Sequence, residues 1–519
     1  MALVTDKFRI YAAEAFRNTL GSTGSDANKV YLFVGRAKQW GSPDSPPTNE
    51  PIDSFTYHRS TYADSVAFKR VDITDTSLVV PRVDWIDPTE TTGGTGRTYS
   101  MYKPDYSPAK TTANGATRLY DSNFYVMNSD FRVYECIYNG ANPTNSGKGI
   151  ASLEEPTHTD LQPRLESDGY LWKYLYTIKP SDIVKFDSVD YIPVPQDWLN
   201  NSDTLDVRNA AVDGKIETVV IEDTTSAAYQ FSGTKNNVPI RGDGQDGLAS
   251  VSFVNGKPTT VQVTNGGSGY TFATLDLDSV VTGSGAVFSV IIPPPKGHGA
   301  DIYSELGANK VLVYSRIENS DTTNPDFPVG NQFARIGILK NPNVNGTTNL
   351  LTASSASGVY GLRLAGAASS TMSVSVDGQI TQTIGIGSTA VGKIISYDPV
   401  TKFLRYWQDR SLATNSSTGV NPTFGYRLNR FTSTPSTGGS INVVVTTTTG
   451  TETVGIETTF TGVSTSVNSK TYYFGQSINS GIASPEIEKY SGDIIYIDNR
   501  PEVTRAPNQR EDIKIVLEF

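Results

Sequence analysis

The segment GYLWKYLYTI, residues 169–178, restricts the possible folds of this chain more than any other stretch. Its residues alternate, so that an extended strand presents four aromatic side chains on one face: Tyr170, Trp172, Tyr174 and Tyr176. The opposite face carries Leu171, Lys173, Leu175 and Thr177. Because an aromatic face of this size must be covered by a second layer of protein, we expect layered β-structure.

Short apolar or alternating runs recur along the chain and predict a mainly β protein of several domains, built from sandwich-like modules. FYVM (124–127) and FRVYECIYN (131–139) are expected to pair across the turn sequence NSD. KIISYDPVTKFLRYWQ (393–408) is expected to form a hairpin across Asp398-Pro399. The composition agrees, because 27 Tyr and 20 Phe residues suit sheets and only 18% of the residues are charged.

Both ends of the chain predict a defined element. TDKFRIYAAEAFRNTLG (5–21) predicts a helix that Thr5 caps and Gly21 ends, with apolar residues at helical spacing: Phe8, Tyr11, Ala12, Ala15 and Phe16. EDIKIVLEF (511–519) predicts a strand with Ile513, Ile515, Leu517 and Phe519 on one face. Other helices are expected to be few and short, as at SDIVKF (181–186).

Shifts in composition divide the chain into a discontinuous core and two inserted modules. Residues 1–208 are expected to form the core domain, completed by 293–345 and 481–519. Residues 209–292 read as a run of short strands and turns, which predicts an inserted β-module. Residues 346–480 predict a second, Ser/Thr/Gly-rich β-module. We find no repeat of fixed period.

Charge and cysteine content exclude several classes of protein. The net charge of −10 does not suit a nucleic-acid binder, which needs clustered Lys and Arg. Cys136 is the single cysteine, so no internal disulfide can form. The N-terminus lacks a signal-peptide pattern, and no apolar run reaches the length of a membrane span. These features predict a soluble protein, without membrane contact, that folds in a cytoplasm.

Histidines give the strongest candidates for chemistry. His58, His158 and His298 stand about a hundred residues apart, and no paired metal-ligand spacing is present. The best local candidate for a metal or catalytic site is His298-x-x-Asp301 in the stretch PPPKGHGADIYSEL. The alternative, which we favour, is a Gly-flanked turn at a domain crossover, with Asp301 or Ser304 capping a short helix.

Other candidate groups also favour structural roles. Cys136 lies in an alternating strand and is expected to be a buried, inert thiol. The carboxylate pairs Asp84 and Asp87, and Glu154 and Glu155, are of a kind that any acidic protein offers. We therefore predict no catalytic, cofactor-binding or metal-binding residues, no cofactor and no enzymatic activity.

Glycine-rich loops and tryptophans complete the list of candidates. NGGSGY (265–270) and GGTGR (93–97) match no phosphate-binding pattern, and their glycines are expected to serve turns with positive φ. Four tryptophans could line a sugar groove but more often anchor a core or an interface: Trp40, Trp85, Trp198 and Trp407.

Eight segments in succession resemble one family, the baseplate wedge subunit of T4-like contractile-tailed phages, which is the product of gene eight. The resemblance covers about 1–208, 293–345 and 481–519 and rests on the order of the segments. These are VTDKFR (4–9), VYLFVGRAKQW (30–40), DGYLWKYLY (168–176), YIPVP (191–195), GHGADIYSELGA (297–308), FARIGILKNP (333–342), SGDIIYIDNRPEVTR (491–505) and EDIKIVLEF (511–519).

The resemblance implies a structural subunit of the virion. Members of the family are mostly β, non-enzymatic and dimeric, contact other wedge proteins, and help hold the baseplate until the tail contracts. It implies assembly in the host cytoplasm, and the Gly/Pro joint at 293–299 would be a place where rigid β-domains move. The stretches 209–292 and 346–480 look longer than the family pattern; each could hold extra wedge contacts, decorate the particle or bind a fibre.

Two rival functions remain. The first is a tail-borne receptor- or glycan-binding protein, which is expected to show a long trimeric fibre pattern or repeats; it remains open for 346–480. The second is a depolymerising enzyme, which is expected to show a β-helix repeat and a carboxylate cleft. Neither pattern is evident in the sequence.

Overall fold

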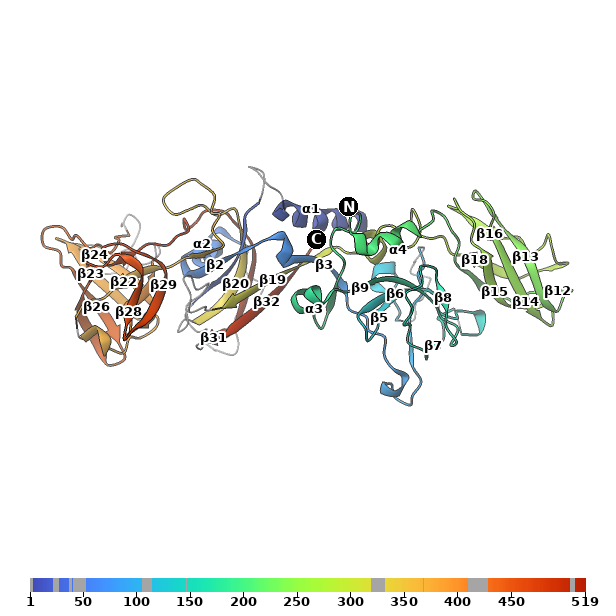
Figure 1. Cartoon of the computed structure of the whole chain (residues 1–519), viewed down its shortest axis with the longest axis horizontal. Helices are drawn as coiled ribbons and strands as arrows, with labels where there is room; N and C mark the ends of the chain where they lie inside the picture. Colours follow the sequence, from blue (N-terminus) through green and yellow to red (C-terminus); the bar gives the residue numbers. More distant parts are fainter. Residues whose placement is uncertain are drawn as a thin grey trace. The chain divides into compact units, whose positions relative to one another are not determined.

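Strands dominate this computed structural model, which describes residues 3–21, 28–36, 40, 53–104, 114–145, 147–318, 332–366, 368–408, 428–504 and 509–519. Figure 1 shows the many antiparallel sheets and the few short helices, and this confirms the predicted fold class. The α-helices are α1 (Asp6–Gly21), α2 (Phe55–Asp64), α3 (Pro180–Phe186), α4 (Leu205–Asn209) and α5 (Ile302–Leu306). Single 3-10 turns are η1 (Ile73–Asp75), η2 (Pro88–Glu90), η3 (Leu119–Asp121), η4 (Pro143–Asn145), η5 (Ser202–Thr204) and η6 (Ala368–Ser370).

The chain divides into two compact units. The first contains residues 1–17, 76–312 and 516–519, and the second contains 18–75 and 313–515. Both units are therefore discontinuous in sequence. This division follows spatial contacts and does not test whether 209–292 and 346–480 are insertions, which stays a prediction.

A four-stranded sheet of the first unit contains the aromatic segment. Its order is β5-β6-β9-β8, with β5 (Tyr125–Met127), β6 (Arg132–Tyr138), β9 (Leu171–Thr177) and β8 (Arg164–Leu165). β5 and β6 pair antiparallel, which confirms the hairpin predicted across NSD. A small additional ladder joins β4 (Arg97–Thr98) to β7 (Ala151–Ser152).

The predicted aromatic face is covered, and so is most of the other face of the strand. Tyr170 and Trp172 are fully buried and stack with ring centroids 5.2 Å apart. Lys173 and Leu175 on the opposite face are also buried. β9 is therefore enclosed on both sides, which alternation alone did not indicate.

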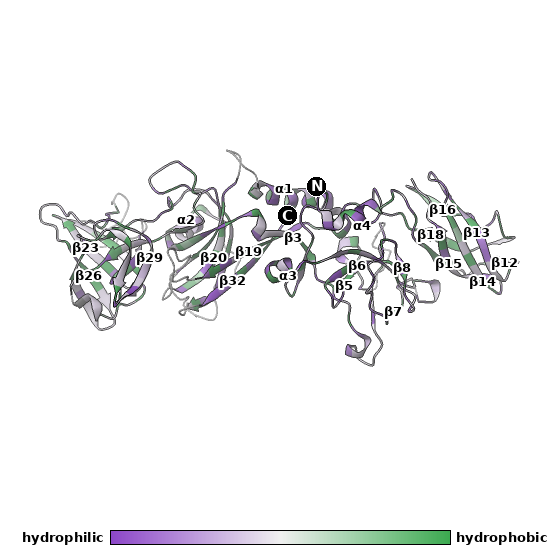
Figure 2. Ribbon diagram, viewed as in Figure 1, coloured by the Kyte–Doolittle hydropathy of each residue, from purple (hydrophilic) through white to green (hydrophobic). Residues whose placement is uncertain are grey.

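Residues 209–292 form small sheets around their own hydrophobic clusters. One sheet has the order β15-β14-β13-β16, with β15 (Lys257–Asn265), β14 (Leu248–Val254), β13 (Gly233–Gly242) and β16 (Ala273–Leu275). Two ladders pair β11 (Val219–Asp223) with β18 (Val287–Val290), and β12 (Ala228–Tyr229) with β17 (Gly283–Ser284). Figure 2 shows hydrophobic and hydrophilic residues alternating along these strands, and the alternating burial of β14 agrees with this pattern.

Two sheets form most of the second unit. The five-stranded sheet has the order β21-β2-β1-β20-β31, with β21 (Ser355–Ser357), β2 (Ser65–Val71), β1 (Val30–Gly35), β20 (Gln332–Lys340) and β31 (Asp493–Thr504). The seven-stranded sheet has the order β27-β26-β23-β24-β25-β22-β30, with β27 (Gly450–Gly455), β26 (Asn442–Thr447), β23 (Gln379–Gly385), β24 (Ser388–Asp398), β25 (Phe403–Trp407), β22 (Tyr360–Arg363) and β30 (Ile482–Ala483). A separate ladder pairs β28 (Gly462–Val467) with β29 (Lys470–Ile478).

The turn between β24 and β25 in the seven-stranded sheet forms where the sequence predicts it. β24 and β25 pair antiparallel with Asp398 opposite Phe403, which confirms the hairpin predicted across Asp398-Pro399. The Asp398 carboxylate accepts hydrogen bonds from the Val400 backbone N–H at 2.9 Å and from the Thr401 hydroxyl at 2.6 Å. An Asp at this position thus stabilises the turn from within.

The last strand belongs to a sheet with the order β10-β3-β19-β32, formed by β10 (Tyr191–Pro193), β3 (Thr76–Pro81), β19 (Lys310–Glu318) and β32 (Arg510–Glu518). Ile513 and Ile515 are buried, and Leu517 and Phe519 are partly buried, so the predicted apolar face is confirmed. The Phe519 ring lies 5.5 Å from the ring of Phe16, between centroids.

Helix α1 has the predicted bounds but buries a different face. The Phe8 backbone N–H donates to Thr5 Oγ1 at 3.3 Å, which confirms Thr5 as the cap. Phe8 and Tyr11, however, are 61% and 67% exposed. The buried side chains are instead Ile10, Ala13, Arg17 and Leu20.

None of the helices in the described ranges has the length and apolar character that a membrane crossing requires.

Candidate functional site

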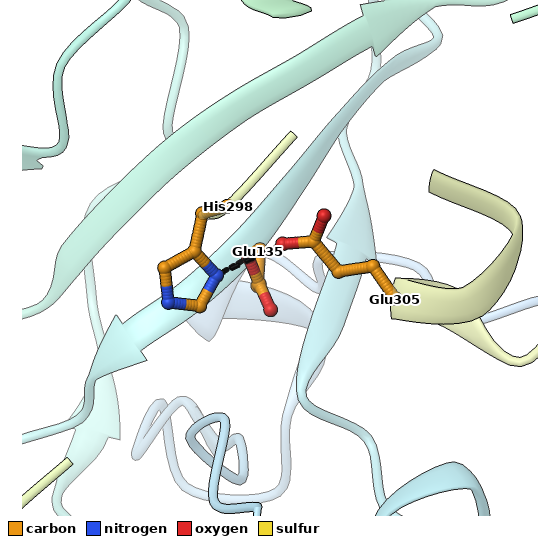
Figure 3. A group of neighbouring side chains, drawn as sticks. All are labelled: Glu135, His298 and Glu305. Atoms are coloured by element: carbon orange, nitrogen blue, oxygen red, sulfur yellow. Dashed lines mark hydrogen bonds and ion pairs between the residues drawn. The ribbon is translucent and has the colours of Figure 1, made fainter. Parts of the chain in front are cut away.

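The buried Gly-flanked turn at residues 297–299 places a histidine against two glutamates. His298 Nδ1 lies 2.8 Å from Oε2 of Glu135 and 2.8 Å from Oε1 of Glu305 (Figure 3). One ligand atom from each residue lies within 4.8 Å of the other two, and within the described ranges no other three such side chains come this close. All three side chains are at least 95% buried: the exposed fraction is 5% for His298, 0% for Glu135 and 1% for Glu305. We call Glu135, His298 and Glu305 the buried triad.

Three separate segments supply the triad. Glu135 lies in the middle of β6, His298 lies in the turn, and Glu305 lies in α5. Asp301 caps α5, because its carboxylate accepts from the Ser304 backbone N–H at 3.3 Å. Gly307 ends α5 with a left-handed φ of 72°. These local signals hold Glu305 one turn beyond the cap, where it can reach back to His298.

The predicted pair of His298 and Asp301 does not act as a ligand pair. The Asp301 carboxylate accepts hydrogen bonds from Ser304 as the cap of α5, and the partners of His298 are Glu135 and Glu305. The favoured alternative, a Gly-flanked turn with Asp301 capping the next helix, is confirmed at the local level. The triad that the turn joins was not predicted.

One signal in the sequence could have identified Glu135. In FRVYECIYN, Glu135 shares a strand face with Val133 and Ile137, both of which are buried. A carboxylate between two buried apolar residues needs a partner or a proton, because an isolated buried charge is costly. The identity of that partner depends on residues more than 150 positions away, which no local pattern can supply.

Burial and mutual interaction shift the pKa values of the triad in different directions. Burial, together with the charge of Glu305, raises the pKa of Glu135 to about 8. Burial alone would lower the pKa of His298, but the charge of Glu135 beside the ring and the hydrogen bond to Glu305 raise it to about 10. Burial would raise the pKa of Glu305, but its hydrogen bond to His298 lowers it. The imidazole is thus favoured as a cation beside at least one carboxylate.

Surrounding groups fix the orientation of the triad. The Gly299 backbone N–H donates to Oε2 of Glu305 at 2.7 Å, and the ring of Tyr102 meets the His298 ring edge-on at 4.8 Å between centroids. The indole N–H of buried Trp198 donates to the carbonyl oxygens of Gly299 and Ala300 at 3.2 and 3.1 Å. Hydrogen bonds from Trp198 and to Glu305, together with the packing of Tyr102, therefore hold the turn in place.

Lys173 is a further charged residue that interacts with the triad. It pairs in register with Glu135 across β6 and β9 and is buried. Its ammonium group donates to the Leu161 carbonyl oxygen at 2.9 Å. Burial lowers the pKa of Lys173, while the charge of Glu305 opposes that effect.

The other two histidines lie outside the triad. His158 is buried in the first unit, with its ring 5.4 Å from that of Tyr134 between centroids. Its Nε2 lies 3.9 Å from Oε1 of Glu166, which is too far for a hydrogen bond. His58 lies in α2 of the second unit and pairs with Asp53 at 3.2 Å.

Cys136 and the candidate carboxylate pairs have structural surroundings. Burial raises the pKa of the Cys136 thiol well above its usual value, as expected of an inert thiol. Asp84 forms an ion pair with Arg82 at 2.8 Å, and Asp87 caps η2. Glu154 and Glu155 accept hydrogen bonds from the backbone N–H groups of two turns, at Ser167 and Ser129.

Tryptophans and glycine-rich loops also serve the fold. Trp198 is fully buried, and Trp40, Trp85 and Trp407 are partly buried. The glycines of the two singled-out loops that adopt positive φ, as turns require, are Gly93, Gly94, Gly96, Gly267 and Gly269. Their role in turns is thus confirmed.

Two surface hollows lie in residues 209–292 and share Arg241. Their volumes are about 300 and about 420 Å³. Arg241 forms an ion pair with Asp276 at 2.5 Å, and Asp243 holds a turn through hydrogen bonds to Thr271 and Phe272. Arg241, the charged residue that both hollows share, is therefore already paired within this part of the chain.

Comparison with known proteins identifies one distant relative. No protein-family model matches the chain. The baseplate wedge protein gp8 of Enterobacteria phage T4 is 28% identical over 207 residues, which cover 37% of this chain and 60% of the relative. The chain thus spans less than two thirds of the length of the curated relative that it matches. The protein is distantly related to gp8, as the succession of segments indicates.

Proposed function

We propose that this protein is a structural subunit of a phage tail baseplate wedge. In this role it bridges neighbouring wedge proteins and helps hold the baseplate before the tail contracts. The distant relationship to the baseplate wedge protein gp8 is the observation that carries the proposal. The protein acts in the virion, after assembly in the host cytoplasm as a homodimer.

The surface and the candidate groups support a non-enzymatic role. The carboxylate pairs singled out from the sequence are engaged in ion pairs, caps and turns, as described above. Large apolar side chains are exposed on both units, for example Tyr11, Phe55, Phe272 and Ile386. A scaffold subunit can bury such side chains against neighbours in a large interface.

The proposal is tested by co-purification from infected cells. The tag belongs in the turn between β26 and β27, because Thr448 and Thr449 are exposed there. The C-terminus is a poor site, because Phe519 packs against Phe16. We expect a dimer that brings down several other tail proteins, identified by mass spectrometry and native mass.

The opposite result is equally specific. If the protein is recovered alone, as a trimer bound to host envelope material, the wedge proposal is wrong and a receptor-binding role takes its place. Incubation with host polysaccharide separates the enzymatic rival, since a depolymerase would shorten the chains and a wedge subunit would not.

A further inference from the structure

The buried triad contains more acceptors than the one N–H of the His298 ring that lies against them can satisfy. Oε2 of Glu135 and Oε1 of Glu305 lie equally close to His298 Nδ1, at 2.8 Å. A ring nitrogen carries one hydrogen in the plane of the ring, so it can donate well to only one of them. The hydrogen bond goes to Glu305, and within the described ranges neither oxygen of Glu135 accepts a hydrogen bond. Glu135 is completely buried.

A protonated His298 can offset the charge of one of the two carboxylates, and the second then requires a proton or a further cation. A cation has the better geometry, because it can contact all three converging atoms together while a proton bridges only two. Two carboxylate oxygens and one imidazole nitrogen form a ligand set that suits divalent first-row metals such as Zn²⁺ and Mn²⁺. Such an ion needs Nδ1 as an acceptor, with the ring proton on Nε2.

The surroundings resemble the supporting shell of a metal site. The Gly299 N–H orients Glu305 at 2.7 Å, and Tyr102 packs against the imidazole ring. Hydrogen bonds that orient ligands in this way are typical around bound metals. Lys173 opposes a cation by its charge, but its ammonium group points to the Leu161 carbonyl oxygen and forms no ion pair with Glu135.

We infer that Glu135, His298 and Glu305 bind one divalent transition-metal ion, which ties the 297–305 segment to strand β6. Because all three side chains are buried, the ion must enter as the domain folds, and its binding free energy then contributes to stability. This site has a structural role and is independent of the proposed place of the protein in a baseplate.

Metal content of the whole chain provides the direct test. The protein is purified without a histidine tag, stripped with EDTA while unfolded, and refolded with Zn²⁺ or with Mn²⁺. Native mass spectrometry and elemental analysis should find one ion per chain. The thermal midpoint should rise with the metal, as expected of a ligand that binds only the folded state.

Variants assign the ion to the triad. Glu135→Gln and His298→Gln should bind the metal at least tenfold more weakly, whereas His158→Gln should keep the wild-type stoichiometry. His158→Gln is the matched control, because it removes another buried imidazole from the same unit. Lys173→Met should bind the metal more tightly, since it removes an opposing charge.

Two results overturn the inference. One is wild-type protein that refolds without bound metal and with the same thermal midpoint in Zn²⁺, in Mn²⁺ and in EDTA. The other is metal that remains in Glu135→Gln and His298→Gln, which would indicate adventitious surface binding. If the triad variants fail to refold, the wild-type measurement still decides.

Discussion

At the scale of single residues, His158 illustrates how burial sets protonation. Its side chain is 2% exposed, and its Nδ1 accepts a hydrogen bond from the Asp160 backbone N–H at 3.3 Å. Burial lowers the pKa of His158. Folding therefore favours the neutral ring, because the buried environment solvates the protonated imidazole poorly.

This burial predicts loss of stability in mild acid. The unfolded chain protonates His158 near its ordinary pKa of about 6.5, whereas the folded chain does so only at lower pH. Between these values the unfolded state binds more protons, so the free energy of unfolding falls as the pH falls. Urea midpoints at pH 7.5 and 5.5 should differ less in His158→Gln than in the wild type. Equal differences would show that His158 does not contribute.

A second residue, Arg335, predicts the cost of breaking a buried ion pair. Its side chain is 4% exposed and pairs with Asp64 at 3.2 Å, while it also donates to Asn499 at 3.0 Å. Arg335→Ala removes the buried guanidinium group that pairs with Asp64 and donates to Asn499, and it should lower the free energy of unfolding by about 3–5 kcal/mol. Asp512→Ala removes a more exposed pair with Arg316, so a loss as large as that of Arg335→Ala would contradict this account.

At the scale of elements, helix α1 shows that spacing identifies a helix without identifying its buried face. Phe8 and Tyr11 are exposed, while Ile10 and Ala13 are buried. Two apolar stripes overlap on this helix, because alanines and aromatic residues occur on several sides. Which of the two stripes is buried is determined by the surfaces that pack against the helix.

Substitutions on the two faces of α1 should therefore differ. Ile10→Ala should lower the free energy of unfolding by about 2–5 kcal/mol, as for other buried large-to-small changes. Phe8→Ala should change it by less than about 0.5 kcal/mol, as at other exposed sites. Urea unfolding followed by circular dichroism measures both. A larger loss for Phe8→Ala would show that the other stripe is the buried one.

The Gly297 turn has similarly strict requirements. Gly297 and Gly299 have φ values of 92° and 88°, and a Cβ on Gly297 would lie 2.4 Å from the Val212 carbonyl oxygen. Proline, which needs φ near −65°, would disrupt the turn and cannot be used to freeze a joint at 293–299.

Alanine at this turn gives a graded prediction. Gly346 also has a positive φ, of 71°, but a Cβ there would meet open space. Gly346→Ala should cost about 1–2 kcal/mol of backbone strain. Gly297→Ala should cost roughly 3 kcal/mol or more, because overpacking adds to the strain. Equal losses in urea unfolding would mean that Val212 moves aside freely.

At the scale of the whole molecule, both proposed insertions leave and return at adjacent points. The Asp213 carboxylate accepts a hydrogen bond from the Lys296 backbone N–H at 2.6 Å, next to the start and end of 209–292. The Asn345 backbone N–H donates to the Glu486 carbonyl oxygen at 3.0 Å, near the start and end of 346–480. Such short spans are what an inserted module requires. We therefore propose that both stretches are insertions, 209–292 in the first unit and 346–480 in the second.

Excision tests this proposal. Replacement of residues 216–292 by a short Gly/Ser linker should leave a folded chain, because the flanking residues already lie close together. Residues 209–292 expressed alone should also unfold cooperatively, since they contain their own hydrophobic clusters around Val251 and Ile240. An excised chain that is soluble only as aggregates would show that the segment is part of the core.

The sequence alone determined the features that depend on neighbours along the chain. Alternation identified the strands and hairpins, Thr5 and Asp301 marked the starts of helices, and the order of eight segments indicated the distant relationship to gp8. These signals are local, because turn chemistry, capping and strand period involve residues within a few positions of one another.

Only the tertiary structure decided which groups meet. It placed Glu135 beside His298 and Glu305, enclosed both faces of β9 and exposed Phe8. The physical reason is that burial and electrostatic partners are set by contacts between segments far apart in sequence. A carboxylate in a strand looks the same in sequence whether it faces water or, as Glu135 does, a histidine from a distant turn.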